Sequence, residues 1–419
     1  MLTSQWTVLE EEWEAMEREE QRNAWERSLE WASRLIDAIA RQVPFFRSIR
    51  EAFTAEGEEL VNWSHAEEIA VLVAQSEKVE GPPPGPEVQE AFREMKERSV
   101  ELVARYSRLQ PREPIGEVLV LDRPGWIRAN LDSFRLIFRP LAESYRRTLE
   151  RWEAGGGAVT ALGKRITHGI LTAQLGMVIG YLARNVLGQF DLGLPDMEDG
   201  GRLYVVYPNM LKAERNLRLV PSDFRLWITL HEVTHAFEFA SHPWLRRYLK
   251  ELMERYFGSV SLRLEEIGLR LKPEEFVDAR RLDEIMREGG LLSVIHTPEQ
   301  RAVLAEIQAF MSLVEGYSNL IMDLAGRDMI PSYEEMSRAF RRRRELKSGA
   351  ERFIERMLGF DLKLQQYHVG ELFCREVYEN RGLDFLNLAW KYREYLPTSE
   401  EIRKPYLWMD RIAREEGEH

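Results

Sequence analysis

Two histidines four residues apart, with a glutamate directly after the first, form the segment His231-Glu232-Val233-Thr234-His235. Residues four apart lie on one face of an α-helix, so the two imidazoles would point at one spot. Such a pair can supply two ligands of a zinc ion, and the intervening carboxylate can accept a proton from water. Chance would produce roughly 0.03 such matches in a chain of this composition. The spacing predicts a metal site with Glu232 as general base; the alternative is two core histidines beside a surface glutamate.

The helix expected to hold this segment has a clear start and one apolar side. Pro221-Ser222-Asp223 provides a helix cap. The residues expected to face inward continue through the motif and are Phe224, Trp227, Ile228, His231, Thr234, His235 and Phe239. Because this stripe is unbroken, both histidines are expected to face the core, where a water-poor pocket can form.

Two histidines do not complete a site, because a catalytic zinc normally has three protein ligands and one open position. A third histidine in the same segment would need glycine at 238 and histidine at 241, where this chain has Glu238 and Ser241. Glu238 lies one turn beyond His235 on the same helix and is not expected to reach the shared metal. The third ligand is therefore expected from another helix.

The best candidate for the third ligand is Glu315. Its helix is predicted to begin with the capping box Thr297-Pro298-Glu299-Gln300 and to end at Gly326, and Glu315 lies within its apolar stripe. A carboxylate on a buried face is costly unless it is paired or metal-bound. We therefore predict His231, His235 and Glu315 as ligands of one zinc ion, with pairing of Glu315 to an arginine as the alternative.

Other polar residues are candidates for supporting roles. Asn319 and Asp323 follow the third ligand by four and eight residues on the same helix face, where they could orient the zinc-binding histidines; a solvated helix edge explains Asp323 equally well. Hydrolysis also needs a donor where negative charge develops on oxygen. Tyr317 is the candidate for this catalytic role, and Tyr367 and His368 are of suitable type, with ordinary packing or a surface hydrogen bond as the alternative for each.

Helical periodicity dominates the rest of the chain, so we expect a mainly α protein with a multi-helical core and a few short strands. Strands are expected at residues 117–121 and 202–207. The Pro- and Gly-rich end of residues 1–86 cannot be helical and indicates a linker. We therefore predict an N-terminal helical region at 1–86 and a metal-binding core at 87–419.

The composition of the 419 residues is that of an ordinary globular chain, with 44% hydrophobic and 31% charged residues. A net charge of −12 argues against nucleic acid as a partner, because phosphate contacts need a basic surface; the arginine run 341–344 is a local exception. Cys374 is the only cysteine and the N-terminus does not resemble an export signal, so a cytoplasmic location is expected.

The most apolar stretch, residues 170–182, is too short to span a bilayer and has charged residues close on both sides. We therefore expect no membrane as a partner and predict a buried helix here. Gly176 and Gly180 would let a neighbouring helix approach this one closely.

Several blocks of sequence, between roughly residues 115 and 415, resemble a bacterial family of zincin-like metallopeptidases. Its members are labelled putative hydrolases and are often described as associated with biosynthesis of a deazaflavin coenzyme. The blocks are Asp122–Trp126, Val186–Asp191, Val206–Asn209, His231–Phe239, Leu313–Gly316, Leu358–Lys363, Gln366–Tyr367 and Leu396–Thr398. The resemblance implies a compact, mainly helical zincin in which Glu315 matches the glutamate ligand of a gluzincin-type site.

This chain departs from the family pattern at one place. The family commonly has Glu-Gly-His-Ala where this chain has Glu315-Gly316-Tyr317-Ser318. If the usual histidine assists catalysis, we expect Tyr317 to take over a donor role or the activity to differ. No deazaflavin-binding signature is visible, so zinc is the one cofactor expected.

Together these observations favour a zinc-dependent hydrolase acting on a peptide or protein substrate, with Glu232 as general base and then acid. The alternative, from a different class, is a non-catalytic binding or scaffold protein that keeps the zincin fold and its metal.

Overall fold

The computed structural model describes residues 60–77, 83–153, 158–191, 201–270, 298–345 and 365–417. Within these ranges the chain forms twelve α-helices, two short 3₁₀ helices and one three-stranded sheet, which confirms the predicted mainly helical fold. The α-helices are α3 (Trp63–Gln75), α4 (Pro86–Ser107), α5 (Arg123–Glu153), α6 (Ala158–Asn185), α7 (Tyr207–Leu217), α8 (Pro221–Ser241), α9 (Trp244–Arg270), α11 (Pro298–Met329), α12 (Tyr333–Glu345), α14 (Gln365–Leu386), α15 (Ser399–Arg403) and α16 (Pro405–Glu415). The 3₁₀ helices η2 (Asn387–Trp390) and η3 (Arg393–Tyr395) connect α14 to α15.

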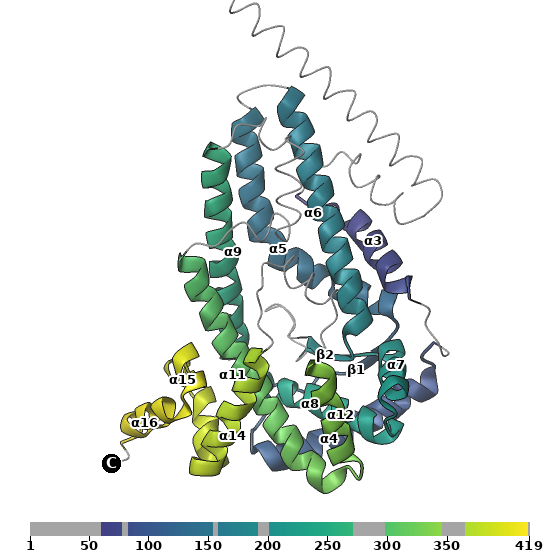
Figure 1. Ribbon diagram of the computed structural model, residues 1–419, viewed down its shortest axis with the longest axis vertical. Helices are drawn as coiled ribbons and strands as arrows, with labels where there is room; N and C mark the ends of the chain where they lie inside the picture. Colours follow the sequence, from purple (N-terminus) through teal and green to yellow (C-terminus); the bar gives the residue numbers. More distant parts are fainter. Residues whose placement is uncertain are drawn as a thin grey trace, which may run out of the picture.

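The long helices α5, α6 and α9 extend from the part of the molecule that holds the sheet, as Figure 1 shows. Helix α8 lies beside the sheet, and α11 runs past α8 and packs against the C-terminal helices α14 and α15 (Figure 1). Both helices that were predicted to supply metal ligands, α8 and α11, therefore lie in the middle of the fold.

The sheet has the order β1-β3-β2, with β1 (Val118–Leu121) parallel and β2 (Gly188–Asp191) antiparallel to the central β3 (Arg202–Val206). Strands β1 and β3 were predicted to within a residue at each end, and β3 stops at Val206 because Pro208 lies in the first turn of α7. Strand β2 was missed, because only Phe190 of its four residues is buried and no apolar alternation marks it.

Helix α8 is buried on almost every side, not only along the predicted stripe, because neighbouring elements surround it. Its predicted start is confirmed, with Pro221 in the first turn, but the predicted side-chain cap is wrong: Val220 is the N-cap and no side chain caps it. Asp223 instead accepts hydrogen bonds from the backbone N–H and hydroxyl of Ser332, at 3.0 and 2.6 Å. It therefore ties α8 to the turn between α11 and α12.

The predicted close approach at Gly176 and Gly180 is confirmed, and the neighbour is α3. A β-carbon would lie 2.8 Å from the carbonyl oxygen of Ala66 at the first position, and 2.5 Å from that of Ala70 at the second. Among the described helices none is long and apolar enough to cross a membrane. The predicted boundary at residue 86 stays a prediction, since residues 1–59 and 78–82 lie outside the described part.

Helix α11 runs three residues beyond its predicted end at Gly326, where a β-carbon would meet the ring of Tyr333 at 2.8 Å. Thr297 of the predicted capping box lies outside the described residues. Further along the helix, β-carbons at Gly316 of α11 or Gly370 of α14 would overlap backbone atoms of the other helix. These two glycines let the backbones of α11 and α14 touch directly beside Glu315.

Candidate metal centre

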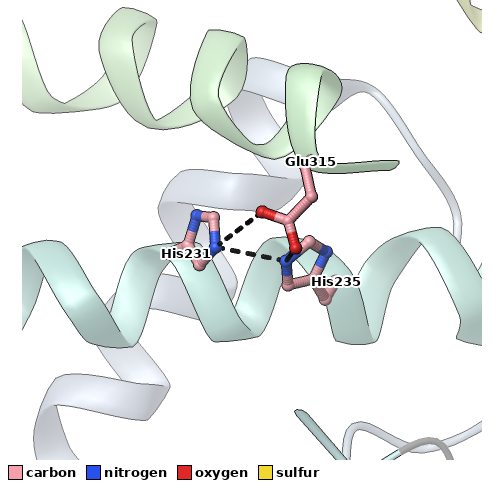
Figure 2. Close-up of side chains that lie close together, drawn as sticks. All are labelled: His231, His235 and Glu315. Atoms are coloured by element: carbon pink, nitrogen blue, oxygen red, sulfur yellow. Dashed lines mark hydrogen bonds and ion pairs between the residues drawn. The ribbon is translucent and has the colours of Figure 1, made fainter. Parts of the chain in front are cut away.

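The three predicted metal ligands meet at one point between α8 and α11. Figure 2 shows His231 and His235 on one helix, with Glu315 reaching them from the other. The two Nε2 atoms are 3.2 Å apart, Oε2 of Glu315 lies 3.5 Å from Nε2 of His231, and Oε1 lies 3.8 Å from Nε2 of His235. One ligand atom from each residue can be chosen so that all lie within 4.8 Å of one another.

This donor set fits a zinc ion. With bonds of about 2.0–2.1 Å, ligand atoms around a tetrahedral zinc are roughly 3.3–3.4 Å apart, within the range of separations seen here. Imidazole nitrogen and carboxylate oxygen are both ordinary zinc ligands. The side chains of His231 and Glu315 are 20% and 22% exposed, so one side of the site is open to solvent. The geometry matches a three-ligand centre with room for a fourth, exchangeable ligand.

Glu238, which was not expected to reach the metal, lies directly behind His235. Its Oε2 is 3.0 Å from Nδ1 of His235, and Ser318 of α11 donates its hydroxyl proton to Oε1 at 3.3 Å. The Ser318 hydroxyl is also 3.0 Å from the same Nδ1. With Nδ1–H donating to the carboxylate, the lone pair of Nε2 is free to face the metal position.

The charges of this buried pair depend on each other. Burial lowers the pKa of His235, but the hydrogen bond to Glu238 and its charge outweigh this and raise the pKa to about 9. Burial raises the pKa of Glu238 to about 7, with His235 opposing. Since the Glu238 side chain is fully buried, its charge has to be balanced locally, by His235 and whatever His235 binds.

Glu232 is held by strand β2. The backbone N–H of Phe190 donates to its Oε2 at 2.8 Å, and a β-carbon at Gly188 would lie only 2.7 Å from Oε1 and 2.8 Å from Cγ. Burial raises the pKa of Glu232, while the charges of His231 and His235 oppose the shift. A carboxyl group with a raised pKa next to a metal site is suited to accepting and returning a proton.

A closed set of three hydrogen bonds attaches β2 to α5. The indole N–H of Trp126 donates to Oε1 of Gln189 at 2.6 Å, and Nδ2 of Asn130 donates to the carbonyl of Trp126 at 2.9 Å. Nε2 of Gln189 in turn donates to Oδ1 of Asn130 at 2.7 Å. Gln189 stands between Gly188 and Phe190, so this set holds the strand that positions Glu232.

Two of the predicted supporting residues are directed elsewhere. Tyr317 follows Glu315 by two residues, about 200° around the helix, and its buried hydroxyl donates to Oδ1 of Asn387 at 2.7 Å and to the carbonyl of Ser107 at 3.3 Å. Asp323 accepts hydrogen bonds from the hydroxyl of Tyr333 and from Arg375.

The structure thus does not bring Tyr317 or Asp323 into the cluster of His231, His235 and Glu315. Tyr317 points away from Glu315 around the helix, and Asp323 lies about 12 Å further along the helix than Glu315. Asn319 is buried on the face of Glu315, and its orienting role stays a prediction. The side chains of Tyr367 and His368 lie outside the described part. Glu238 could have been found from its spacing, because it is three residues after His235 and therefore on the same face.

A mainly helical fold, with two histidines on one helix and a glutamate on a second placed so that they could hold one metal ion, fits the zincin class. The match to a family model agrees: residues 61–409 match the zincin-like metallopeptidases, and the chain belongs to that family.

It is also similar to a solved crystal structure, a "putative hydrolase with a novel fold" from Chloroflexus aurantiacus, at 34% sequence identity and a TM-score of 0.63. That alignment covers 84% of this chain and 99% of the other. No curated protein sequence matches the chain.

Proposed function

We propose that this protein is a zinc-dependent peptidase that hydrolyses a peptide bond in a peptide or protein substrate. Membership of the zincin-like metallopeptidase family supports metal-dependent hydrolysis. The observation behind the finer proposal is that Glu232, a residue that a purely structural metal site has no need of, is held beside the ligands by β2.

In this proposal His231, His235 and Glu315 hold the zinc ion. When bound, zinc acts as a Lewis acid that polarises a carbonyl group and makes water more acidic. Glu232 takes up a proton from the attacking water and passes it to the leaving amine. The Phe190 amide occupies Oε2 of Glu232, which leaves Oε1 to accept the proton. Glu238 and Ser318 keep His235 in the tautomer whose Nε2 faces the metal.

The test combines metal analysis with hydrolysis of a mixed peptide library by the full chain and by Glu232→Gln. We expect one zinc per chain in both proteins, with cleavage slowed by roughly 10²–10⁴-fold in the variant, the usual contribution of a general base. Glu379→Gln, which alters an exposed glutamate on α14, is the matched control and should cleave normally.

Absence of metal from the wild-type chain would refute the proposal. Stoichiometric zinc without any cleavage would instead favour a non-catalytic zincin-fold scaffold. That alternative further requires a partner complex that persists in Glu232→Gln.

A further inference from the structure

A polar cavity of about 70 Å³ lies where the end of α6 meets α7. Its polar lining consists of Arg184 and Asn185 of α6 and Asn209, Lys212 and Asn216 of α7. A single water needs roughly 10–15 Å³, so several water-sized groups fit. Among the described residues that line the cavity none is acidic, although the chain has a net charge of −12.

Three cations converge on one carboxylate at this cavity. The oxygens of Glu77 lie 3.1 Å from Nη2 of Arg123, 2.5 Å from Nζ of Lys212 and 3.7 Å from Nε of Arg184. Burial raises the pKa of Glu77, but the three cations outweigh it and hold the pKa below its ordinary value. Among the described residues of this group, one negative charge therefore faces three positive charges, which leaves a surplus of two positive charges.

Two of the three cations are on side chains that a ligand can reach. Arg123 is 3% exposed and donates to Asn209 and to the carbonyl of Ala74 as well as to Glu77. Arg184 and Lys212 are 31% and 39% exposed and line the cavity. An ammonium has three N–H donors and a guanidinium five, so their contacts with Glu77 leave donors for a ligand.

We propose that this cavity binds a small dianionic oxyanion of the phosphate class, held by Arg184 and Lys212 with Asn216 at its edge. Guanidinium and ammonium groups are the side chains that recognise phosphate, the first as a fork and the second as a point charge. A dianion also matches the two surplus positive charges. The ligand is a free ion or the phosphoryl group of a larger compound that extends into solvent. None of the residues that line this cavity belongs to the His231, His235 and Glu315 cluster, and the binding proposed here does not require hydrolytic activity.

Isothermal titration calorimetry of the full chain with inorganic phosphate tests the proposal, in parallel with phenyl phosphate. Saturable one-site binding is expected, weakened roughly tenfold or more in Lys212→Gln and in Arg184→Gln by loss of a charge-assisted hydrogen bond. Asn216→Leu should also weaken binding, because it obstructs the cavity while leaving the ion pairs with Glu77 in place. Tighter binding of phosphate indicates a free ion, and tighter binding of phenyl phosphate indicates a phosphoryl group.

Lys404→Gln, which removes an exposed cation from outside the cavity, is the matched control and should bind as wild type does. Thermal melts verify that each variant is folded. If Lys212→Gln or Arg184→Gln does not fold, Asn216→Leu still tests the cavity, because it leaves the ion pairs with Glu77 in place. Because phosphate can also bind zinc, each titration is repeated with a chelator. The proposal is overturned if wild type shows no saturable binding, if Lys404→Gln weakens it as much as Lys212→Gln does, or if the signal disappears with the chelator.

Discussion

His235 can bind a metal through Nε2 only while that nitrogen carries no proton, and the Glu238 carboxylate, 3.0 Å from Nδ1, favours the tautomer with the proton on Nδ1. The fully buried Glu238 carboxylate has His235 as its ionic partner, so the two side chains orient each other. This pairing between a metal ligand and a carboxylate is a common way to raise the basicity of a histidine ligand.

Replacement of Glu238 by glutamine should therefore weaken zinc binding by roughly 10–100-fold, because the amide keeps the shape but not the charge. Competition with a chromophoric chelator measures the affinity. Glu379→Gln, at an exposed site on α14, is again the control. Unchanged affinity in Glu238→Gln would show that the carboxylate only fills space.

Gly188 limits the position of Glu232, since a β-carbon there would press on Oε1 and Cγ of that side chain. Gly188→Ala should therefore lower the turnover of the proposed hydrolysis, by about tenfold or more for a displacement near 1 Å, with zinc content unchanged. Steady-state kinetics and metal analysis on the same preparation separate the two effects. Full activity in Gly188→Ala would mean that the carboxylate can move without loss.

At the scale of elements, the position of Glu315, the proposed third ligand, depends on how α11 packs against α14. The two backbones touch at Gly316 and Gly370, so any side chain at either position has to push the helices apart. We expect Gly316→Ala to lower the free energy of unfolding by about 1–3 kcal/mol, as overpacking does, and to weaken zinc binding through Glu315.

Gly258→Ala is the matched control for this change. It lies in α9, and a β-carbon there would meet nothing within 4 Å among the described atoms. Alanine should stabilise that helix by about 0.5–1 kcal/mol, because it has the higher helix propensity. Urea unfolding of both variants measures the change in the free energy of unfolding. If Gly316→Ala stabilised the protein as Gly258→Ala does, the close contact between α11 and α14 would be contradicted.

The charge of Glu401 in helix α15 should make the stability of the protein depend on pH. Its Glu401 closes a capping box with Thr398 and accepts two hydrogen bonds from Arg411, at 2.7 and 3.1 Å. Burial raises the pKa of Glu401, but Arg411 and Thr398 outweigh this and hold it below the ordinary 4.5. The folded pKa is the lower one, so the stabilisation is present above about pH 4.5 and is lost as pH falls through the folded value.

Glu401→Gln should therefore cost about 2 kcal/mol of unfolding free energy near neutral pH, and the difference from wild type should shrink below pH 4.5. Denaturant unfolding at several pH values measures it. Glu400→Gln, next to it but 62% exposed, should change stability by only a few tenths of a kcal/mol. A difference that stays constant down to low pH would rule out the charged pair as its source.

At the scale of the whole molecule, the proposed metal centre would join α8 to α11, two helices that are far apart in the chain. A ligand that binds only the folded state stabilises it by mass action, by about 4 kcal/mol at a thousandfold excess over Kd. We therefore expect a chelator to lower the melting temperature of the wild-type chain in calorimetry. Glu232→Gln should keep this metal-dependent shift in melting temperature, and His235→Ala should lose it. A wild-type melting temperature that does not change with the chelator would contradict the proposed metal centre.

Several parts of the site followed from the sequence alone, because they depend on positions within a single helix. A period of 3.6 residues places His231 and His235 on one face wherever the helix lies. The apolar stripe around Glu315 likewise indicated a carboxylate on the inward face of its helix that needs a partner, although the structure leaves this side chain 22% exposed. The glycines at 176 and 180 indicated a close contact, although not that α3 makes it.

Only the tertiary structure decided which groups surround those residues. Strand β2 has too little apolar pattern to be recognised, yet it positions Glu232 through Phe190 and Gly188. Tyr317 lies only two residues after Glu315 but faces Asn387, because two residues turn a helix by about 200°. The residues proposed to bind the metal could thus be predicted from their spacing along single helices. The residues that hold them in place, and the basic cavity, arise from contacts between elements, which no periodicity within one element encodes.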